Sequence, residues 1–223
     1  MSNRISSNGT SETKRKLLEA GVTLMRARGF NATSVDEICA TAGVTKGGFF
    51  HYFKSKDEIA KAALAQFHEA KAKIYDEASF RKLADPLKRV FGRLDYVAEA
   101  SGGARRVTKG CLIGVLAQEL ASINPELRNI CQDFFSRIAG DFARDLTEAK
   151  AAYAPKAKFD PASVAQSYVA LVQGSLLMAK TAASNEILLN NLDQFRNYLQ
   201  CLFGLNKPVE SGHSVKNATT SRG

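Results

Sequence analysis

The sequence predicts an all-α protein of about nine helices: an N-terminal three-helix domain with a helix-turn-helix, followed by a larger helical domain. Its 223 residues are 45% hydrophobic, which suits a globular chain with a real core. The chain has only five prolines. No run of alternating β-branched residues is long enough to predict a sheet.

The first helix is predicted from Glu12 to Arg28, after a polar arm at residues 1–10 that we expect to be disordered. The apolar face of this helix consists of Leu17, Leu18, Val22, Leu24 and Met25. Gly29 follows the last apolar turn and ends the helix.

Residues 33–56 have the pattern of a helix-turn-helix. The buried face of its first helix is an i, i+3, i+4, i+7 set made of Val35, Ile38, Cys39 and Ala42. Ser34 can cap this helix with Glu37 as its reciprocal partner, and Gly43 suits the turn because glycine tolerates positive φ.

The second helix of the motif is predicted to start at Thr45, with Phe49 and Phe53 facing inward. Its exposed end then consists of Thr45, Lys46, Gly47 and Gly48. A helix end with polar groups, free N–H groups and little bulk fits the major groove of DNA.

The second domain is predicted at 57–205, behind a DNA-binding domain at 11–56, and a disordered tail is expected at 206–223. A long helix from about 56 to 78 joins the two domains and can carry motion between them. Further helices are predicted near 85–100, 109–121, 125–152, 161–183 and 187–203. Three of them begin with a capping residue followed by proline: Asp85-Pro86, Asn124-Pro125 and Asp160-Pro161.

The composition favours a cytoplasmic protein with a polyanionic partner. The net charge is +9, although the basic residues are spread along the chain. The N-terminus has no apolar run, and the stretch from Val164 to Ala179 is shorter than the roughly 20 residues of a membrane span. The four cysteines are far apart, so we expect reduced thiols and no metal site. We expect no cofactor and no enzyme activity, because no catalytic motif occurs.

The helix-turn-helix region resembles the TetR/AcrR family of bacterial transcription regulators. The residues that carry the resemblance are Lys16-Leu-Leu-Glu-Ala-Gly21, Arg28-Gly-Phe30, Thr33-Ser-Val-Asp-Glu-Ile38, Ala42-Gly-Val44 and Lys46-Gly-Gly-Phe-Phe-His-Tyr-Phe-Lys-Ser-Lys56. A weaker resemblance to one branch of the family runs from Lys109-Gly-Cys-Leu112 to Asn124-Pro-Glu-Leu-Arg128. The resemblance to the family implies a homodimer that binds a palindromic operator, usually as a repressor, and is released from it by a small hydrophobic or electrophilic molecule.

The resemblance also implies a set of DNA contacts. By position, these are Thr33, Ser34, Thr45, Lys46, Gly47, Gly48 and Lys56. The sequence departs from the family at Phe50, where a tyrosine commonly donates a hydrogen bond to a phosphate. His51 or Tyr52 can take over part of that role.

Ligand and dimer residues are predicted in the second domain, each with packing as the alternative. The ligand candidates are Phe67, Phe91, Tyr96, Cys111, Gln118, Phe134, Tyr168 and Gln173. Cys111 resembles the cysteine of electrophile-sensing family members, but a buried structural thiol is the alternative. The dimer candidates form an apolar seam on the last two helices: Leu176, Leu188, Leu192, Phe195, Leu199 and Leu202.

Two other functions remain open at this point. One is a DNA-coating protein that binds any duplex and takes no ligand. The other is a small-molecule-binding enzyme whose DNA domain is vestigial. The glycines and lysines preserved around residues 46–56 argue against the second.

Overall fold

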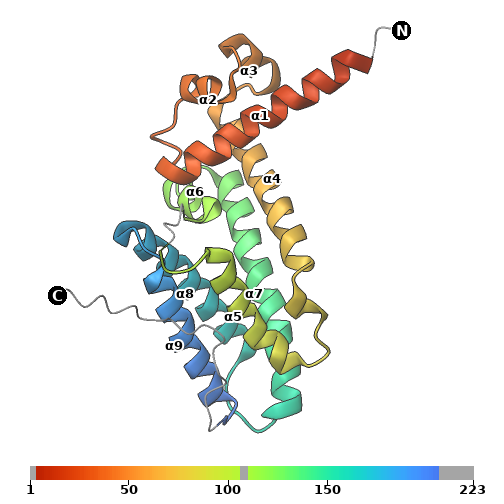
Figure 1. Ribbon diagram of the computed structural model, residues 1–223, viewed down its shortest axis with the longest axis vertical. Coiled ribbons are helices and arrows are strands. Elements are labelled where there is room, and N and C mark those ends of the chain that lie inside the picture. The colour runs from red at the N-terminus through yellow and green to blue at the C-terminus, as the bar shows by residue number, and fades with distance from the viewer. Residues whose placement is uncertain (1–3, 106–109, 206–223) are drawn as a thin grey trace, which may run out of the picture.

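The computed structural model describes residues 4–105 and 110–205, in which it contains helices and no strand (Figure 1). The elements are α1 (Arg4–Arg28), α2 (Val35–Ala42), α3 (Lys46–Tyr52), α4 (Lys56–Asp76), the 3₁₀ helix η1 (Ser79–Lys82), α5 (Pro86–Ser101), α6 (Leu112–Leu120), α7 (Pro125–Tyr153), α8 (Pro161–Ala182) and α9 (Glu186–Leu202). The all-α prediction is confirmed.

The helices form two units along the long axis of the molecule (Figure 1). The helices α1, α2 and α3 make the upper unit, and α1 crosses the top of the body. The helix α4 leads from this unit down into the body, where α7 contacts α5, α6 and α8, and α8 contacts α9. The two units are therefore connected along the chain through α4.

The three predicted cap-and-proline starts are confirmed. The Asp85 carboxylate accepts a hydrogen bond from the Leu87 N–H at 2.8 Å, and the Asn124 amide oxygen accepts one from the Leu127 N–H at 3.1 Å. The Asp160 carboxylate accepts a hydrogen bond from the N–H of Ser163 at 3.0 Å. Such a cap contributes about 1 kcal/mol, and the following proline has no N–H that needs a partner.

Some boundaries differ from the prediction. The helix α1 begins at Arg4 rather than Glu12, so residues 4–10 of the expected arm are helical. No proline interrupts that stretch, and extending an existing helix costs much less than nucleating one. The helix α6 begins at Leu112 rather than at 109. The expected tail at 206–223 lies outside the described residues.

Two clusters of buried apolar side chains hold the chain together. The first contains Leu17, Ile38 and Phe49 of the upper unit together with Leu112 and Leu116 of α6. The second lies among α5, α7, α8 and α9. Because the first cluster includes α6, the packing of the helix-turn-helix extends across the predicted domain boundary at residue 56.

The helix α8 corrects the membrane argument. With 22 residues and a mean hydropathy of 1.2, it is the one helix of the described residues that could cross a bilayer by length and composition. Core helices of soluble proteins pass the same test. Within this single chain only 28% of its apolar window is buried, so one face of α8 remains uncovered.

Candidate nucleic-acid interface and ligand cavity

The start of α2 is fixed by the predicted capping box. The Ser34 hydroxyl accepts a hydrogen bond from the Glu37 N–H at 3.2 Å, and the Glu37 carboxylate accepts one from the Ser34 N–H at 2.9 Å. The Glu37 carboxylate accepts hydrogen bonds from the N–H and the hydroxyl of Ser34 and from Arg28 at 2.9 Å, and these bonds lower the pKa of Glu37 to about 2. The carboxylate is therefore ionised at neutral pH and the cap is intact there.

The turn that follows sets the direction of α3. Gly43 adopts φ +65°, and the N–H of Val44 donates to the Cys39 carbonyl at 3.0 Å. The Thr45 hydroxyl then caps α3 by accepting from the Gly48 N–H at 3.1 Å. Phe49 is fully buried beneath the helix. The predicted motif is thus present as a packed unit, with α3 held against α1 and α2.

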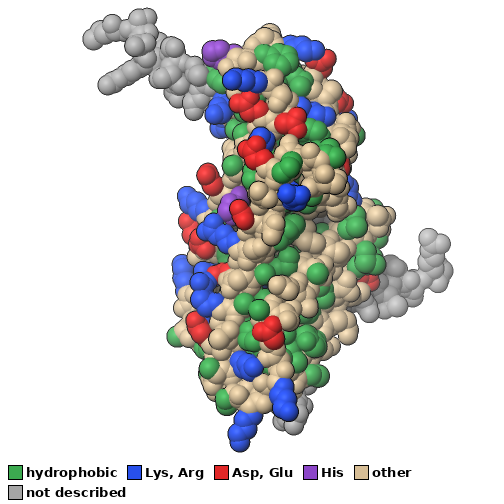
Figure 2. Space-filling view, turned by 180° about the vertical axis from the view of Figure 1, so that it is seen from behind, with side chains coloured by type: hydrophobic (Ala, Val, Ile, Leu, Met, Phe, Trp, Pro, Cys, Tyr) green, Lys and Arg blue, Asp and Glu red, His purple; other side chains and the backbone are tan. Residues whose placement is uncertain are grey.

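The outer face of α3 is polar, open and mixed in charge. Thr45, Lys46, Gly47 and His51 are exposed, and no atom lies within 4 Å of the place where a Gly47 Cβ would be. The Lys46 ammonium lies 2.9 Å from the Asp36 carboxylate, which raises the pKa of Lys46. Figure 2 shows basic and acidic side chains intermingled over this end of the molecule. The distribution of charge therefore does not distinguish this surface as a candidate DNA-binding face. What distinguishes it is the exposed start of α3 with open space beside Gly47.

Two of the expected DNA contacts form hydrogen bonds within the chain. Thr33 is only 1% exposed, and its hydroxyl donates to the Gly29 carbonyl at 2.7 Å. The Lys56 ammonium donates to the Phe30 carbonyl at 2.9 Å and lies 4.0 Å from the centre of the Phe30 ring. Both side chains therefore bind the loop between α1 and α2; Thr33 is buried, whereas Lys56 remains partly exposed. Tyr52 is half-buried.

Three of the eight ligand candidates share one cavity. It has a volume of about 170 Å³ and lies between the end of α1, the start of α6 and α8. Cys111, Gln118 and Gln173 line it, together with Lys180. A side chain on Gly114 would collide with the Gln173 amide, so this glycine makes room for the amide. The cavity combines a partly exposed thiol, two amides, the cationic side chains of Arg28 and Lys180 and the carboxylate of Glu119.

The other five ligand candidates do not line this cavity. Phe91 and Tyr168 are buried in the second apolar cluster, and burial raises the pKa of Tyr168 to about 12. Tyr96 contacts the Phe80 ring, with 5.7 Å between ring centres. Phe67 and Phe134 pack against the first cluster.

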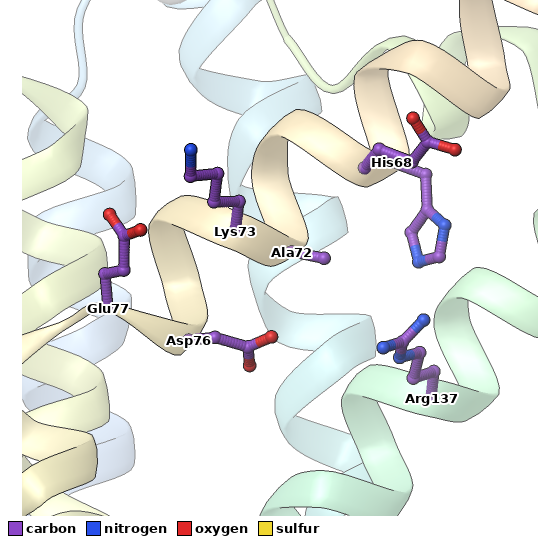
Figure 3. A pocket seen from close by; sticks show the side chains of 7 residues that line it. His68, Ala72, Lys73, Asp76, Glu77 and Arg137 are labelled. Carbon is purple, nitrogen blue, oxygen red and sulfur yellow. The ribbon is translucent and has the colours of Figure 1, made fainter.

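A larger hollow of about 560 Å³ lies between α4 and α7 (Figure 3). Its lining consists of His68, Glu69, Ala72, Lys73, Asp76, Glu77 and Arg137. Figure 3 shows His68 and Asp76 extending from α4 toward the side where Arg137 lies on α7. With only one small apolar side chain in its lining, this hollow does not suit a hydrophobic ligand, and it contains none of the predicted residues.

Comparison with known proteins bears directly on this arrangement. A family model for bacterial regulatory proteins of the tetR family matches residues 17–63, and one for the C-terminal domain of LmrA/YxaF-like transcriptional regulators matches residues 87–194. The transcriptional regulator AcuR of Cereibacter sphaeroides is 30% identical over 166 residues, which cover 74% of each chain. The chain belongs to the TetR family.

Other TetR-family relatives agree over most of the chain. The transcriptional repressor NemR of Escherichia coli K12 is 25% identical over 188 residues, covering 84% of this chain and 94% of NemR. A crystal structure of regulatory protein TetR from Rhodobacter sphaeroides matches with a TM-score of 0.72 at 26% identity, over 85% of this chain and 97% of that one. Members of the TetR family are DNA-binding transcription regulators and not enzymes, so these two predictions are confirmed.

The predicted dimer seam of this TetR-family chain faces its own core. Leu188, Leu192, Phe195 and Leu199 are at most 5% exposed and belong to the second apolar cluster, which corrects their assignment. Leu176 lines the cavity and Leu202 is half-buried. The exposed large apolar side chains of α8 and α9 are instead Leu177, Met178 and Tyr198.

The sequence did not reveal the contacts that join α6 to the end of α1. The Glu119 carboxylate accepts a hydrogen bond from the Asn31 N–H at 2.7 Å, and a side chain on Gly29 would collide with it. The Arg26 guanidinium donates to the Gly110 carbonyl at 2.6 Å. The only signal in the sequence was a carboxylate within an otherwise apolar helix.

Proposed function

We propose that this TetR-family regulator is a cytoplasmic bacterial repressor, which binds a palindromic operator as a homodimer and releases it when a small molecule occupies the cavity at Cys111. The observation that carries the proposal is the outer face of α3. Thr45, Lys46 and Gly47 project from a helix whose other side is fixed by buried Phe49 and Phe53. Such a short helix needs no further rearrangement to enter a major groove.

The uncovered faces of α8 and α9 support the homodimer. Leu177 and Met178 are 50% and 51% exposed on α8, and Tyr198 is 45% exposed on α9. Ala170 and Gly174 are also exposed on α8 and allow a second helix to approach closely. A second copy of this pair of helices would remove that apolar surface from water. The pairing also supplies two α3 helices, which can read half-sites about 34–36 Å apart.

A route from the cavity to the DNA-binding unit runs through α6. Cys111 lies at the N-terminal end of α6. Glu119, which accepts the hydrogen bond from the Asn31 N–H, lies near the C-terminal end. A ligand between α6 and Gln173 of α8 would displace α6 and, with it, the end of α1. The long helix α4 moves with the same unit. The ligand shifts the equilibrium only by its higher affinity for the dimer shape that does not fit DNA.

The first test is a nuclease footprint of the purified protein on its own promoter region. We expect protection limited to one two-fold symmetric site, bound by a dimer, with affinity that falls steeply with salt. Uniform protection of any duplex would contradict the proposal and favour a DNA-coating protein. A protein that stays monomeric and binds no duplex in dilute buffer would exclude both.

Cys111 provides a test of release by an electrophile. Burial raises the pKa of the Cys131 thiol to about 11 and also raises that of Cys39, so both react poorly. Cys111 lines the cavity and is accessible. We expect N-ethylmaleimide to release wild-type protein from its operator, and Cys111→Ser to bind DNA normally but resist release by at least about tenfold.

The matched control is Cys201→Ser, which removes the exposed thiol on α9 far from the cavity. This variant should respond to the reagent as the wild type does. Release of Cys111→Ser at wild-type concentrations of reagent would show that Cys111 is only a structural thiol. Gel-shift titration of the three proteins, each matched for helical content, measures these outcomes.

A further inference from the structure

The side chain of Phe50 is the one large apolar group on the outer face of α3 in the described structure. It is 50% exposed, whereas Phe49 and Phe53 of the same motif are buried. Its ring meets the edge of the Phe49 ring, with 5.3 Å between the centres and 82° between the planes. The ring of Phe50 therefore rests on a buried neighbour and presents its other side to solvent.

The neighbours of Phe50 place it on the surface proposed to meet DNA. Lys46 lies one helical turn before it, at i−4, and Gly47 lies at i−3, so the three share one side of α3. No atom lies within 4 Å of the position that a Cβ on Gly47 would take. With no side chain there, the backbone of α3 can approach the bases closely enough for a ring on the next turn to reach them.

The chemistry of the ring limits what it can contact. A phenyl ring has no donor or acceptor, so it cannot hydrogen-bond a phosphate or the polar atoms of a base edge. The major groove offers one apolar feature on a base edge, which is the C5 methyl group of thymine. Burying half-exposed apolar surface against that methyl group is favourable, while burying it against polar base edges would leave them unsatisfied.

We infer that Phe50 determines operator specificity by contacting a thymine methyl group in each half-site. The inference rests on the proposed operator binding and adds to it the identity of one base and the residue that reads it.

The test replaces thymine by deoxyuridine, which lacks only the methyl group, at each position of the footprinted operator in turn. For the wild type we expect one position per half-site where the change weakens binding about fourfold, and roughly fifteenfold when both half-sites are changed. Phe50→Ala should bind the two operators equally. Phe50→Tyr, which keeps the ring, should retain the preference for thymine.

The matched control is Leu83→Ala, which removes another exposed apolar side chain at a site remote from α3. It should preserve the preference in full. Specific operator binding by the wild type with no sensitive thymine would overturn the inference and leave the proposed function standing. A uniform loss for Phe50→Ala on every duplex would also overturn it, because that result means contact with the sugar-phosphate backbone. Absence of any operator binding would remove both proposals.

Discussion

Replacing Arg93 with methionine is expected to lower the free energy of unfolding by about 3–5 kcal/mol. Arg93 is 1% exposed, and its guanidinium lies 3.0 Å from Asp145 and 3.1 Å from Asp141, both on α7. It also lies against aromatic rings, 4.8 Å from the centre of Phe142 and 5.0 Å from that of Tyr75. The substitution leaves the buried Asp145 carboxylate with Arg89 as its remaining cationic partner in the described residues, and it removes the cation from between the rings.

Urea denaturation followed by circular dichroism measures this loss. The control is Arg144→Ala, which removes another ion pair to Asp141 from a side chain that is 59% exposed. Such an exposed pair contributes at most about 1 kcal/mol. Adding Asp145→Asn to Arg93→Met should restore part of the stability, because it removes the buried carboxylate charge that has lost one of its two cationic partners. A loss below about 1 kcal/mol for Arg93→Met would show that the arginines still paired with the two carboxylates, Arg89 with Asp145 and Arg81 with Asp141, compensate for it.

The Arg93 cluster also explains why the ligand residues were predicted poorly. An arginine on α5 that pairs with carboxylates 48 and 52 residues later leaves no local pattern in the sequence. In the structure this cluster lies beside Phe142, a neighbour of Tyr168 in the second core. Tyr96 and Tyr168, two of the aromatic residues assigned to a pocket, therefore belong to the packing around this buried charge.

What the sequence did predict depends on short-range chemistry. Ser34 with Glu37, Gly43 and Thr45 define the helix-turn-helix because caps and turns involve residues only a few positions apart. The same holds for the prolines that begin α5, α7 and α8. Contacts across the fold could not be predicted in this way.

The leucine seam of α9 shows the limit of periodicity. The spacing of Leu188, Leu192 and Leu199 correctly indicated a helix with one buried side. Periodicity does not say whether that side meets the same chain or a second copy, because both remove it from water equally well. In the structure this side of α9 packs against the same chain. The uncovered face of α8 is then the candidate contact for a second copy.

Replacing Lys46 with alanine is expected to weaken operator binding by about 30- to 1000-fold. The Lys46 side chain is 60% exposed on the outer face of α3, and a dimer presents two copies. Each contact to a base edge or phosphate contributes about 1–2 kcal/mol, so the loss of both gives about 2–4 kcal/mol. Circular dichroism should show an unchanged fold, because the side chain covers no part of the core.

The salt dependence of this variant identifies the group that Lys46 contacts. A phosphate contact predicts a uniform loss on all duplexes and a shallower slope of affinity against salt, by about two for the dimer. A base contact predicts a loss confined to the operator.

Lys156→Ala, in the exposed loop between α7 and α8, is the matched control and should bind as the wild type does. Asp36→Asn removes the carboxylate 2.9 Å from Lys46 and should tighten binding. Equal affinities for Lys46→Ala and Lys156→Ala would contradict the assignment of this face to DNA, because a basic side chain at the centre of a reading surface cannot be lost without effect.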